Sequence, residues 1–520
     1  MATDALPSRR AVRARARHEA VRRPFGTHAA AQGRHASVAG EGLGRLLGWT
    51  TAGAILPGLG FLVAGRRRLG TVLLGLVGLV TVAGVALVAS GAVTNIGLKA
   101  AVRPKVLLAI AVVAILAGLI WSAVIVGGHW ALRRVRYRPS QNLLSGVLVA
   151  ALVVGVIAPT GTIARYALAQ RDVVLNVFKG SENRDPNLAA PDLKAKDPWA
   201  TTPRVNVLLI GSDAGHNRTG TRPDTLIVAS IDTKTGNTVL LSLPRNLQKV
   251  PFPDGTPGAQ AWPNGFNCGN ECLINAIWTW AEEHKDLFPG DPQPGLTATR
   301  QAVSATLGLS VDYYALVNLA GFQDVVNAMG GVEINVERPL PIGRSDKYLQ
   351  PGRRVLNGYD ALWYARSRRD SSDYDRMKRQ RCLIGAAIDQ ADPVKLALAF
   401  PQLAASAQRN VETDVPSSHL DAFVQLALRV KDAKVTSLAF TDEVIHPANP
   451  NFPEIRAAVK KAVADTEKAA PTTKPKPKPT TSAGPAESAT PTPAPTKSKS
   501  DTEAPVENPN RAQDLNDVCG

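Results

Sequence analysis

The most informative absence in this 520-residue chain is net charge in its C-terminal part. The formal net charge is +17, yet residues 166–520 hold 40 basic and 40 acidic residues. Residues 1–165 hold 20 Lys and Arg against three acidic residues. Phosphate binding by a nucleic-acid groove needs a basic surface, so the neutral C-terminal part argues against DNA or RNA binding there. A basic surplus that precedes and interrupts apolar stretches is instead typical of the cytoplasmic flanks of membrane spans.

Three common catalytic motifs are also missing from the sequence. No glycine-rich loop is followed by Lys-Ser or Lys-Thr, as P-loop enzymes require. The chain has no Gly-x-Ser-x-Gly turn and no His-Glu-x-x-His helix. The chain is therefore not expected to be a P-loop enzyme, a serine hydrolase with this turn or a zinc protease with this helix.

Cysteine is absent from the first half of the chain. The four cysteines are Cys268, Cys272, Cys382 and Cys519, all after the last apolar stretch. An even number in an extracytoplasmic domain predicts disulfides. Cys268 and Cys272 could close a small loop and leave Cys382 for Cys519, but the spacing allows other pairings. A zinc site is disfavoured because no second Cys-x-x-Cys or His pair accompanies them.

Four uncharged stretches make a membrane region of residues 46–165. They are Leu46–Gly65, Leu69–Leu98, Val106–Gly128 and Leu143–Ala164. A membrane-spanning helix needs about 20 apolar residues, so all four are long enough. Pro57, Gly58 and Gly60 interrupt the first, which we therefore interpret as a re-entrant or interfacial hairpin over 46–65. The predicted spans are then about 70–92, 106–128 and 143–164.

The distribution of arginine sets the expected orientation. Residues 1–45 form a tail with nine arginines, and further arginines lie at 66–68 and 133–138. With three spans, all of these stay on the cytoplasmic side and everything after Ala164 lies outside. Four spans, with a cytoplasmic C-terminal domain, are the alternative. A cleaved signal peptide is not expected, because the apolar stretch starts late and further ones follow.

A mixed pattern of strands and helices follows a linker over 166–203 and defines a domain over 204–465. Strands are predicted at Val205–Ile210, Leu226–Ile231, Val239–Leu243, Val332–Val336 and Val435–Phe440. Helices are predicted at 296–307, 376–391, 393–409 and 418–431. Thr235-Gly236-Asn237 marks an antiparallel hairpin. The predicted fold class is α/β, an α-β-α arrangement in which helices cover a central mixed sheet, preceded by transmembrane helices.

The end of the chain differs in composition. Residues 466–511 are rich in Pro, Thr and Lys, and residues 470–510 contain ten prolines but no aromatic residue, Leu, Ile or Met. Such a segment cannot bury enough apolar surface to offset the entropy of ordering, so a disordered linker is predicted. Residues 512–520 form a less biased C-terminal tail that can dock back through its cysteine.

Polar residues gather at the ends of the predicted strands. Gly211-Ser212-Asp213 follows the first strand, Arg222-Pro223-Asp224-Thr225 opens the second and Ser242-Leu243-Pro244-Arg245 closes the third. A fourth group combines Arg366-Ser367-Arg368 with Asp373-Tyr374-Asp375-Arg376 and Arg379-Gln380. Arg366 and Arg368 share one face if their segment is extended, and Arg376 and Gln380 share one face of a helix.

Several arginines with two carboxylates suit a diphosphate and a divalent cation. One guanidinium group can bind two phosphate oxygens at once through two of its N–H groups. Asp213 and Asp224 could hold a Mg²⁺ ion that bridges the same phosphates. The alternative for the fourth group is a solvated charged face. Asp224 could likewise be only the charge partner of Arg222, and Asp213 a turn residue.

Together, these clusters resemble the LytR–CpsA–Psr family of membrane-anchored cell-wall enzymes over about residues 204–391. The resemblance is carried by Leu208-Leu209-Ile210-Gly211-Ser212-Asp213, Arg222-Pro223-Asp224-Thr225, Ser242-Leu243-Pro244-Arg245, Asn275-Ala276, Gly330-Gly331-Val332, Leu356-Asn357-Gly358 with Ala361-Leu362, and Arg366-Ser367-Arg368 through Arg376 and Gln380. The family often has Asp after Pro-Arg, where this chain has Asn246. Composition and the number of spans look like an actinobacterial member.

The resemblance implies a Mg²⁺-dependent phosphotransferase at the cell membrane. It would move a glycopolymer from a polyprenyl diphosphate to peptidoglycan, forming a phosphodiester bond outside the cell. The diphosphate ligands would be Arg222, Arg245, Arg366, Arg368, Arg376 and Gln380. Asp213 and Asp224 would bind the metal, and Asp224 is also a candidate base.

Two alternative functions stay open at this stage. One is a hydrolase that cleaves the lipid diphosphate with water as acceptor. The other is a non-catalytic wall-binding protein or transcriptional attenuator. Nucleic acid is not an expected partner, because the only surplus of basic residues is explained by membrane orientation.

Overall fold

The computed structural model describes residues 29–90, 92–133, 137–181, 185–212, 222–343, 346–369, 371–391, 410–442, 444–468 and 512–519. The chain divides into two compact units. One comprises Met1–Val82 with Gly118–Ala158, and the other comprises Ala83–Ala117 with Pro159–Gly520. The helix predicted over 393–409 and the predicted ligand Asp213 lie outside the described residues.

Helices make up the described N-terminal part of the chain. They are α1 (Ala29–Ile55), α2 (Leu59–Val63), α3 (Arg67–Ala89), α4 (Ala92–Ala101), α5 (Pro104–Leu132) and α6 (Pro139–Val177). Three of them, α3, α5 and α6, are long and apolar enough to cross a membrane. The stretch read as a hairpin over 46–65 contains the end of α1, a break at Pro57 and then α2.

Helix α6 is longer than the sequence predicted. Its apolar stretch ends at Ala164, but the helix continues to Val177 and occupies the first part of the predicted 166–203 linker. Charged residues can end an apolar stretch without ending a helix. The end of a helix is set by its backbone hydrogen bonds and by the groups that cap its last turn. The rest of that segment is not a free linker either, since Trp199 is buried and its indole N–H donates to the carbonyl of Ala422 at 2.8 Å.

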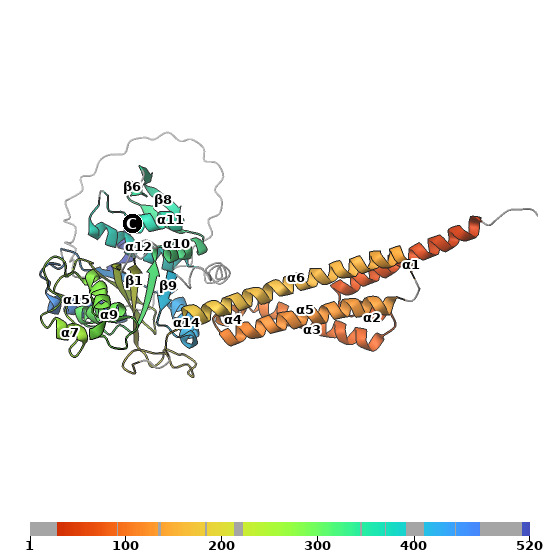
Figure 1. The fold of residues 1–520 in the computed structure, drawn as a ribbon, viewed down its shortest axis with the longest axis horizontal. Coiled ribbons are helices and arrows are strands. Elements are labelled where there is room, and N and C mark those ends of the chain that lie inside the picture. The colour runs from red at the N-terminus through yellow and green to blue at the C-terminus, as the bar shows by residue number, and fades with distance from the viewer. Residues whose placement is uncertain are drawn as a thin grey trace, which may run out of the picture. The chain divides into compact units, whose positions relative to one another are not determined.

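A seven-stranded mixed sheet forms the centre of the second unit (Figure 1). Its order is β11-β10-β3-β2-β1-β4-β9. The strands are β1 (Arg204–Ser212), β2 (Pro223–Asp232), β3 (Thr238–Leu243), β4 (Tyr313–Asn318), β9 (Val411–Thr413), β10 (Val435–Ala439) and β11 (Gln513–Asp514). β1 pairs antiparallel with β2 and parallel with β4, and β10 pairs parallel with β3. Gly236 lies in the turn between β2 and β3, as predicted.

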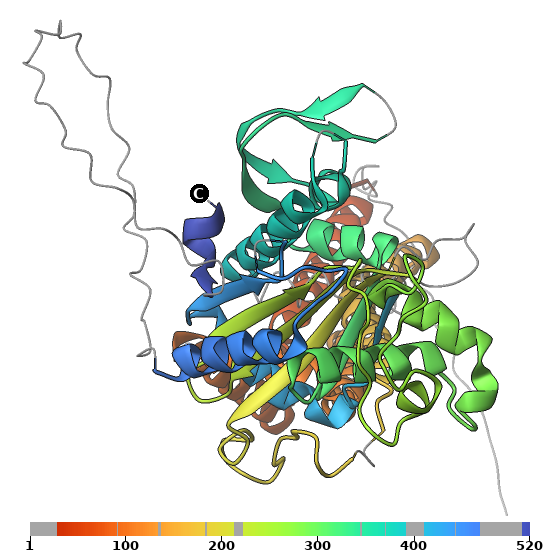
Figure 2. The same ribbon diagram turned by 90° about the vertical axis from the view of Figure 1, so that its left-hand side faces the viewer.

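Helices cover both faces of this sheet. On one face, side chains such as Leu208 and Leu241 share a core with α9 (Pro294–Leu307) and α15 (Phe452–Lys468). On the other face, Ile227 and Leu240 pack with α12 (Asp373–Gln390) and α16 (Leu515–Cys519). Figure 2 shows α15, in blue, and α12, in teal, on opposite sides of the strands. The predicted α-β-α class is therefore confirmed.

The structure describes further helices in this unit. They are α7 (Pro257–Ala261), α8 (Ile277–Glu283), α10 (Leu319–Ala328), α11 (Gly358–Arg366) and α14 (Leu420–Lys431), with short 3-10 helices η1 (Ile274–Ala276), η2 (Lys285–Leu287) and η3 (Ser417–His419). The predicted helices over 296–307, 376–391 and 418–431 correspond to α9, α12 and α14.

One predicted strand lies outside the central sheet. The segment Val332–Val336 is a strand, β5, but it pairs with β8 (Gly352–Leu356) in a separate two-stranded sheet. A further small sheet joins β6 (Leu340–Ile342) to β7 (Lys347–Leu349). Gly330 and Gly331 precede β5 with φ of 85° and 95°, a left-handed conformation that glycine adopts readily and that redirects the chain away from the main sheet.

The C-terminal tail returns to the domain. β11 pairs antiparallel with β10, and Cys519 forms a disulfide with Cys382 of α12. Asp465, Thr466 and Ala512 line one small cavity of about 160 Å³, so the described residues on either side of the proline-rich segment lie close together. The second disulfide joins Cys268 to Cys272.

Candidate active site

A cavity of about 1030 Å³ lies where β1, β2 and β4 meet α11 and α12. Its polar lining includes Arg222, Asp224, Arg245, Asn275, Arg366, Arg368, Arg376 and Gln380. Its apolar lining includes Leu209, Ala315, Val317, Phe322, Leu362, Leu383 and Ile384. Every predicted site residue that the structure describes thus lies around one cavity, which combines a charged region with an apolar one.

A bulge in β2 sets the position of Asp224. Gly211 pairs with Thr225 and Ser212 pairs with Pro223, so Asp224 between them has no partner on β1. A bulged residue is released from the regular alternation of side chains, which allows a strand to aim it at a site. Gly211 permits this geometry, because a Cβ atom there would lie 2.9 Å from the Cβ of Thr225.

Arg245, just after β3, contacts two carboxylates. Its Nη1 donates to Asp224 Oδ1 at 2.9 Å, and its Nε lies 3.4 Å from Asp373 Oδ1. Because β2 and β3 are hairpin partners, Asp224 and Arg245 come from the ends of these strands remote from the turn, as the sequence predicted. The side chains of both are about 30% exposed, so the pair is open to a ligand in the cavity.

Two further arginines complete this charged group. Arg368 Nη2 lies 3.6 Å from Asp224 Oδ1, and its Nε lies 3.8 Å from Asp373 Oδ1. Arg376 Nη2 donates to Asp373 Oδ2 at 2.9 Å and to the carbonyl of Asp224 at 3.3 Å. Three arginines therefore share two carboxylates, which leaves a local surplus of positive charge.

Arg376 is the deeply buried member of the group. Its side chain is 3% exposed, and its Nε is buried without a hydrogen-bond acceptor within the described part of the chain. Burial lowers the pKa of Arg376 to about 10, against the opposing effect of Asp373. A buried guanidinium with an unused donor is unfavourable by itself, so an anionic ligand in the cavity would stabilise it.

Asp373 is the site residue that sequence reasoning did not single out. It is the first residue of α12, after the N-cap Ser372, and its side chain is 25% exposed. The partial positive charge at a helix N-terminus favours a carboxylate at this position. Its spacing of three residues from Arg376 is the signal that could have identified it.

The turn between α11 and α12 holds Arg366 and Arg368. Arg366 is the last residue of α11, and Arg368 follows two positions later, after the helix ends. The two arginines therefore do not belong to one extended segment, which was the condition for the predicted shared face. Arg379, which the sequence analysis placed in the fourth polar group, instead supports this turn. Its Nε donates to the carbonyl of Tyr364 at 2.8 Å, and its Nη2 donates to the carbonyl of Ser367.

The other predicted residues lie at the cavity in different environments. Gln380 lines it and its Nε2 lies 3.3 Å from the carbonyl oxygen of Ala365. Arg222 lines it as an exposed residue. Thr279 was not predicted; its hydroxyl is buried at the cavity without a hydrogen-bond partner among the described residues.

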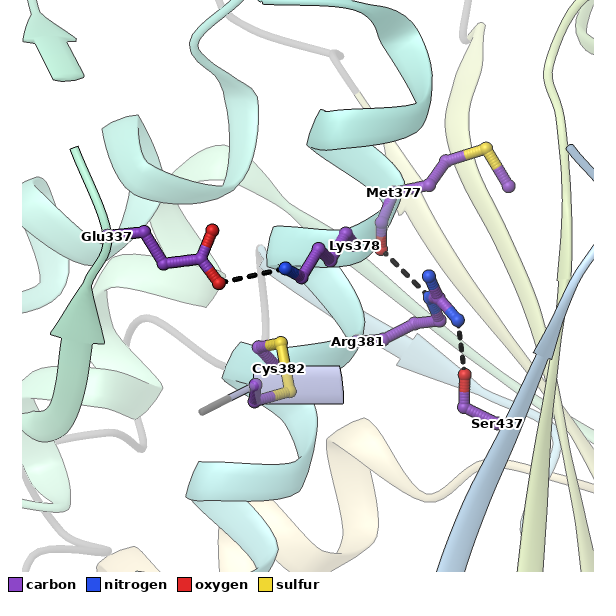
Figure 3. The surroundings of a disulfide bond; sticks show 7 residues. Glu337, Met377, Lys378, Arg381, Cys382 and Ser437 are labelled. Carbon is purple, nitrogen blue, oxygen red and sulfur yellow. Dashed lines mark hydrogen bonds and ion pairs between the residues drawn. A yellow bond between two sulfur atoms is a disulfide. The ribbon is translucent and has the colours of Figure 1, made fainter. Parts of the chain in front are cut away.

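Helix α12, which carries Asp373, Arg376 and Gln380, is held in place by contacts outside the cavity (Figure 3). Arg381 donates to the hydroxyl of Ser437 on β10, and Lys378 pairs with Glu337 at 2.8 Å. Cys382 links the helix to the C-terminal tail. These contacts fix the rotation of α12 about its axis, and with it the direction of the ligand-binding side chains.

The residues described at this cavity fit a divalent cation in part. Asp224 and Asp373 share Arg245 and Arg368 as partners, so their carboxylates face the same space. No cluster of three or more His, Cys, Asp or Glu suited to a metal occurs among the residues that the structure describes. Mg²⁺ is commonly held by one or two carboxylates together with substrate phosphates and water, and two carboxylates meet that minimum.

Comparison with known proteins gives one family. The sequence model of the LytR_cpsA_psr family matches residues 174–466, which includes every strand from β1 to β10 and the whole described cavity lining.

Among curated relatives, two polyisoprenyl-teichoic acid–peptidoglycan teichoic acid transferases are similar to this chain. TagV of Bacillus subtilis is 27% identical over 254 residues, which cover 47% of this chain and 59% of TagV. TagU of Oceanobacillus iheyensis is 29% identical over 223 residues, which cover 42% of this chain and 62% of TagU. The chain thus spans about 60% of the length of these relatives. The crystal structure of B. subtilis TagV matches with a TM-score of 0.38 and 25% identity, over 52% of this chain and 98% of TagV.

Proposed function

This chain belongs to the LytR_cpsA_psr family, and from that premise we propose that it is a membrane-anchored glycopolymer–peptidoglycan phosphotransferase. The donor would be a glycopolymer on a polyprenyl diphosphate and the acceptor a hydroxyl of peptidoglycan. The relatives named for transfer of teichoic acid to peptidoglycan support this class of reaction.

One observation carries the proposal. Three arginines and Asp224 line a cavity that also has apolar walls, and Asp373 contacts all three arginines. A polyprenyl diphosphate has matching parts, since its phosphates suit guanidinium groups and its hydrocarbon chain suits apolar walls. A soluble nucleotide would not need the apolar side chains of Leu383 and Ile384, which come from the same helix as Arg376.

The arginines have two tasks in the proposed reaction. Arg245, Arg366, Arg368 and Arg376 hold the diphosphate and neutralise charge that develops on its oxygens. By holding the donor beside the acceptor, they also make a reaction between two large substrates effectively unimolecular, which lowers the entropic part of the barrier. Arg222 and Gln380 would add contacts at the edge of the cavity.

The chemical step is a substitution at phosphorus. The acceptor oxygen attacks the phosphorus next to the sugar, and the bond from that phosphorus to the bridging oxygen breaks. Polyprenyl monophosphate leaves with the bonding electron pair, and the glycopolymer phosphate becomes a phosphodiester. The hydroxyl proton passes to a carboxylate. We propose Asp224 for this role, supported by its position in the cavity lining and its partial exposure.

Mg²⁺ belongs to this proposal as a cofactor. Asp224 and Asp373 would hold it together with phosphate oxygens, and Asp213, a ligand predicted from the sequence, would be a further one. When bound, the metal would neutralise charge on the diphosphate. Because both carboxylates contact arginines, metal binding requires that some of these ion pairs give way.

The location of the reaction is also proposed. Three helices are suited to spanning a membrane. With the basic segments kept on the cytoplasmic side, these spans put the domain outside the cell, beside peptidoglycan. The two disulfides agree with an oxidising environment.

A reconstitution experiment tests the function and separates it from the hydrolase alternative. The full-length chain in detergent micelles would be given a polyprenyl diphosphate disaccharide and peptidoglycan, with Mg²⁺ or with EDTA. Sugar linked to peptidoglycan and lost with EDTA would support the metal-dependent transferase. Release of sugar phosphate without linkage would favour a hydrolase, and wall binding without turnover would favour an anchor.

A further inference from the structure

An aromatic stripe extends from the charged part of the cavity along α11. Tyr359, Trp363 and Arg366 are spaced by four and three residues, which places them on one face of the helix. The opposite face carries the buried residues Ala361 and Ala365. From Arg366 to Tyr359 the stripe covers about 10 Å at the rise of an α-helix.

The members of the stripe contact one another in sequence. The ring centroids of Tyr359 and Trp363 are 6.3 Å apart with an interplanar angle of 58°. The guanidinium carbon of Arg366 lies 5.2 Å from the centroid of the Trp363 ring, within the range of a cation–π contact. The ring and the guanidinium therefore form a continuous surface.

The stripe also connects the cavity to solvent. Trp363 and Arg366 line the large cavity, whereas Tyr359 is 49% exposed and lies outside that lining. Two large rings held at the surface beside an arginine contribute little to the core, and the neighbouring core cluster contains Ala361, Tyr364 and Ala365 instead. The rings are thus available to a ligand that extends out of the cavity.

The proposed function places a sugar at this position. We propose that Tyr359 and Trp363 form a carbohydrate subsite that stacks against the donor sugar attached to the diphosphate. This inference rests on the proposed function, because Arg366 can present a diphosphate to the stripe only if the arginines bind one. The C–H faces of a pyranose ring carry partial positive charge and complement the negative face of an aromatic ring.

The surroundings favour a sugar over a lipid chain. Asp360 lies three residues before Trp363, and its Oδ2 accepts from Asn357 Nδ2 at 3.0 Å, so hydrogen-bonding groups flank the rings. The apolar residues suited to a hydrocarbon chain come mainly from the sheet, α10 and α12, including Val317, Phe322 and Ile384. A pocket for a sugar combines an apolar face with a few polar groups, which is the composition of the stripe.

Two ligands that differ only in the sugar test this subsite. The full-length chain in detergent micelles would be titrated calorimetrically with polyprenyl diphosphate disaccharide and with polyprenyl diphosphate alone. Trp363→Ala should weaken binding of the sugar-bearing lipid by about tenfold, because the stacking contact with the sugar is lost; this factor corresponds to about 1.4 kcal/mol. Binding of the sugar-free lipid should change by less than about twofold.

Matched variants separate stacking from folding and from charge. Trp363→Phe retains a ring and should restore most of the affinity. Tyr359→Ala alters an exposed side chain and should weaken only the sugar-bearing lipid, by about threefold. Tyr348→Ala is the control, since Tyr348 is a 41% exposed aromatic residue on β7 outside the cavity lining. Arg366→Ala should weaken both lipids.

The outcomes divide clearly. Equal weakening of both lipids by Trp363→Ala would overturn the subsite, because the ring would then serve only the lipid or Arg366. Unchanged binding in both Trp363→Ala and Tyr359→Ala would overturn it as well. Loss of binding to a soluble peptidoglycan fragment instead would move the sugar to the acceptor and overturn the donor assignment. If the unaltered protein bound neither lipid, the subsite and the proposed function would both fail.

Discussion

Arg245 Nη1 lies 2.9 Å from Asp224 Oδ1, which joins a residue two positions after β3 to a bulged residue of β2. The same guanidinium reaches Asp373 of α12 through its Nε at 3.4 Å. Arg245 therefore connects a carboxylate on a strand to a carboxylate on a helix, as Arg368 also does. Its contacts, together with those of Arg368 and Arg376, define the first tests of the site.

Replacing the central arginines should abolish most transfer without unfolding the domain. Arg245→Ala and Arg366→Ala should each lower transfer of sugar to peptidoglycan at least about tenfold, since each removes a charged contact to phosphate. Circular dichroism and the thermal midpoint should stay close to those of the unaltered protein. Unchanged transfer by either folded variant would remove that arginine from the site.

Asp373→Asn tests the carboxylate that aligns the arginines. Loss of its charge would remove the one carboxylate that pairs with Arg245, Arg368 and Arg376 together, so we expect transfer to fall at least about tenfold. Asp375→Asn is the control, because Asp375 lies on the same turn of α12 but pairs with Arg338, which is outside the charged group. Equal activity of these two variants would show that Asp373 acts only at the helix terminus.

The two disulfides should differ in their effect on stability. Cys382→Ser with Cys519→Ser opens a bridge between residues 137 apart, whereas Cys268→Ser with Cys272→Ser opens one between residues four apart. Loop-closure entropy in the unfolded chain predicts losses of about 5 and about 2 kcal/mol. The thermal midpoint should therefore fall further for the first pair. An equal fall, or a larger one for the short loop, would contradict this account.

Acid should remove the stabilising effect of the capping box on α12. The backbone N–H of Ser372 donates to Asp375 Oδ2 at 2.9 Å and holds the pKa of Asp375 below its usual value. A depressed carboxylate pKa stabilises the fold above the unfolded value of about 3.9 and ceases to do so as the pH falls through the folded value.

Asp375→Asn should therefore lower the thermal midpoint at pH 6, and this loss should shrink as the pH falls below about 3.9. The expected loss at pH 6 is at most about 1 kcal/mol, because the side chain is half exposed and solvent weakens its interactions. Thermal unfolding of both proteins between pH 3 and pH 6 measures this difference. A difference that stayed constant over this range would mean that the charge of Asp375 does not contribute.

Much of the architecture followed from local patterns. The β2–β3 hairpin was readable because its two apolar runs flank a turn sequence, and pairing in register brings Arg245 back to Asp224. Helix α12 was readable because its apolar residues recur at helical spacing, which also places Arg376 and Gln380 together. The length of α6 was not predicted, because the end of an apolar stretch does not show where a helix ends. The separate sheet of β5 was not predicted either, because an apolar strand pattern does not show which strand is its partner.

The candidate site, too, was predicted only in part from the sequence. From the sequence we could predict an α/β domain with clustered arginines and carboxylates after apolar helices, because composition, periodicity and turn residues act over a few neighbouring positions. Three features emerged only in the folded protein: Asp373 joins three arginines, a bulge aims Asp224 into the cavity, and Cys382 pairs with Cys519. These features depend on the packing of α12 against β10 and on strand register, which arise from contacts between residues far apart in the chain.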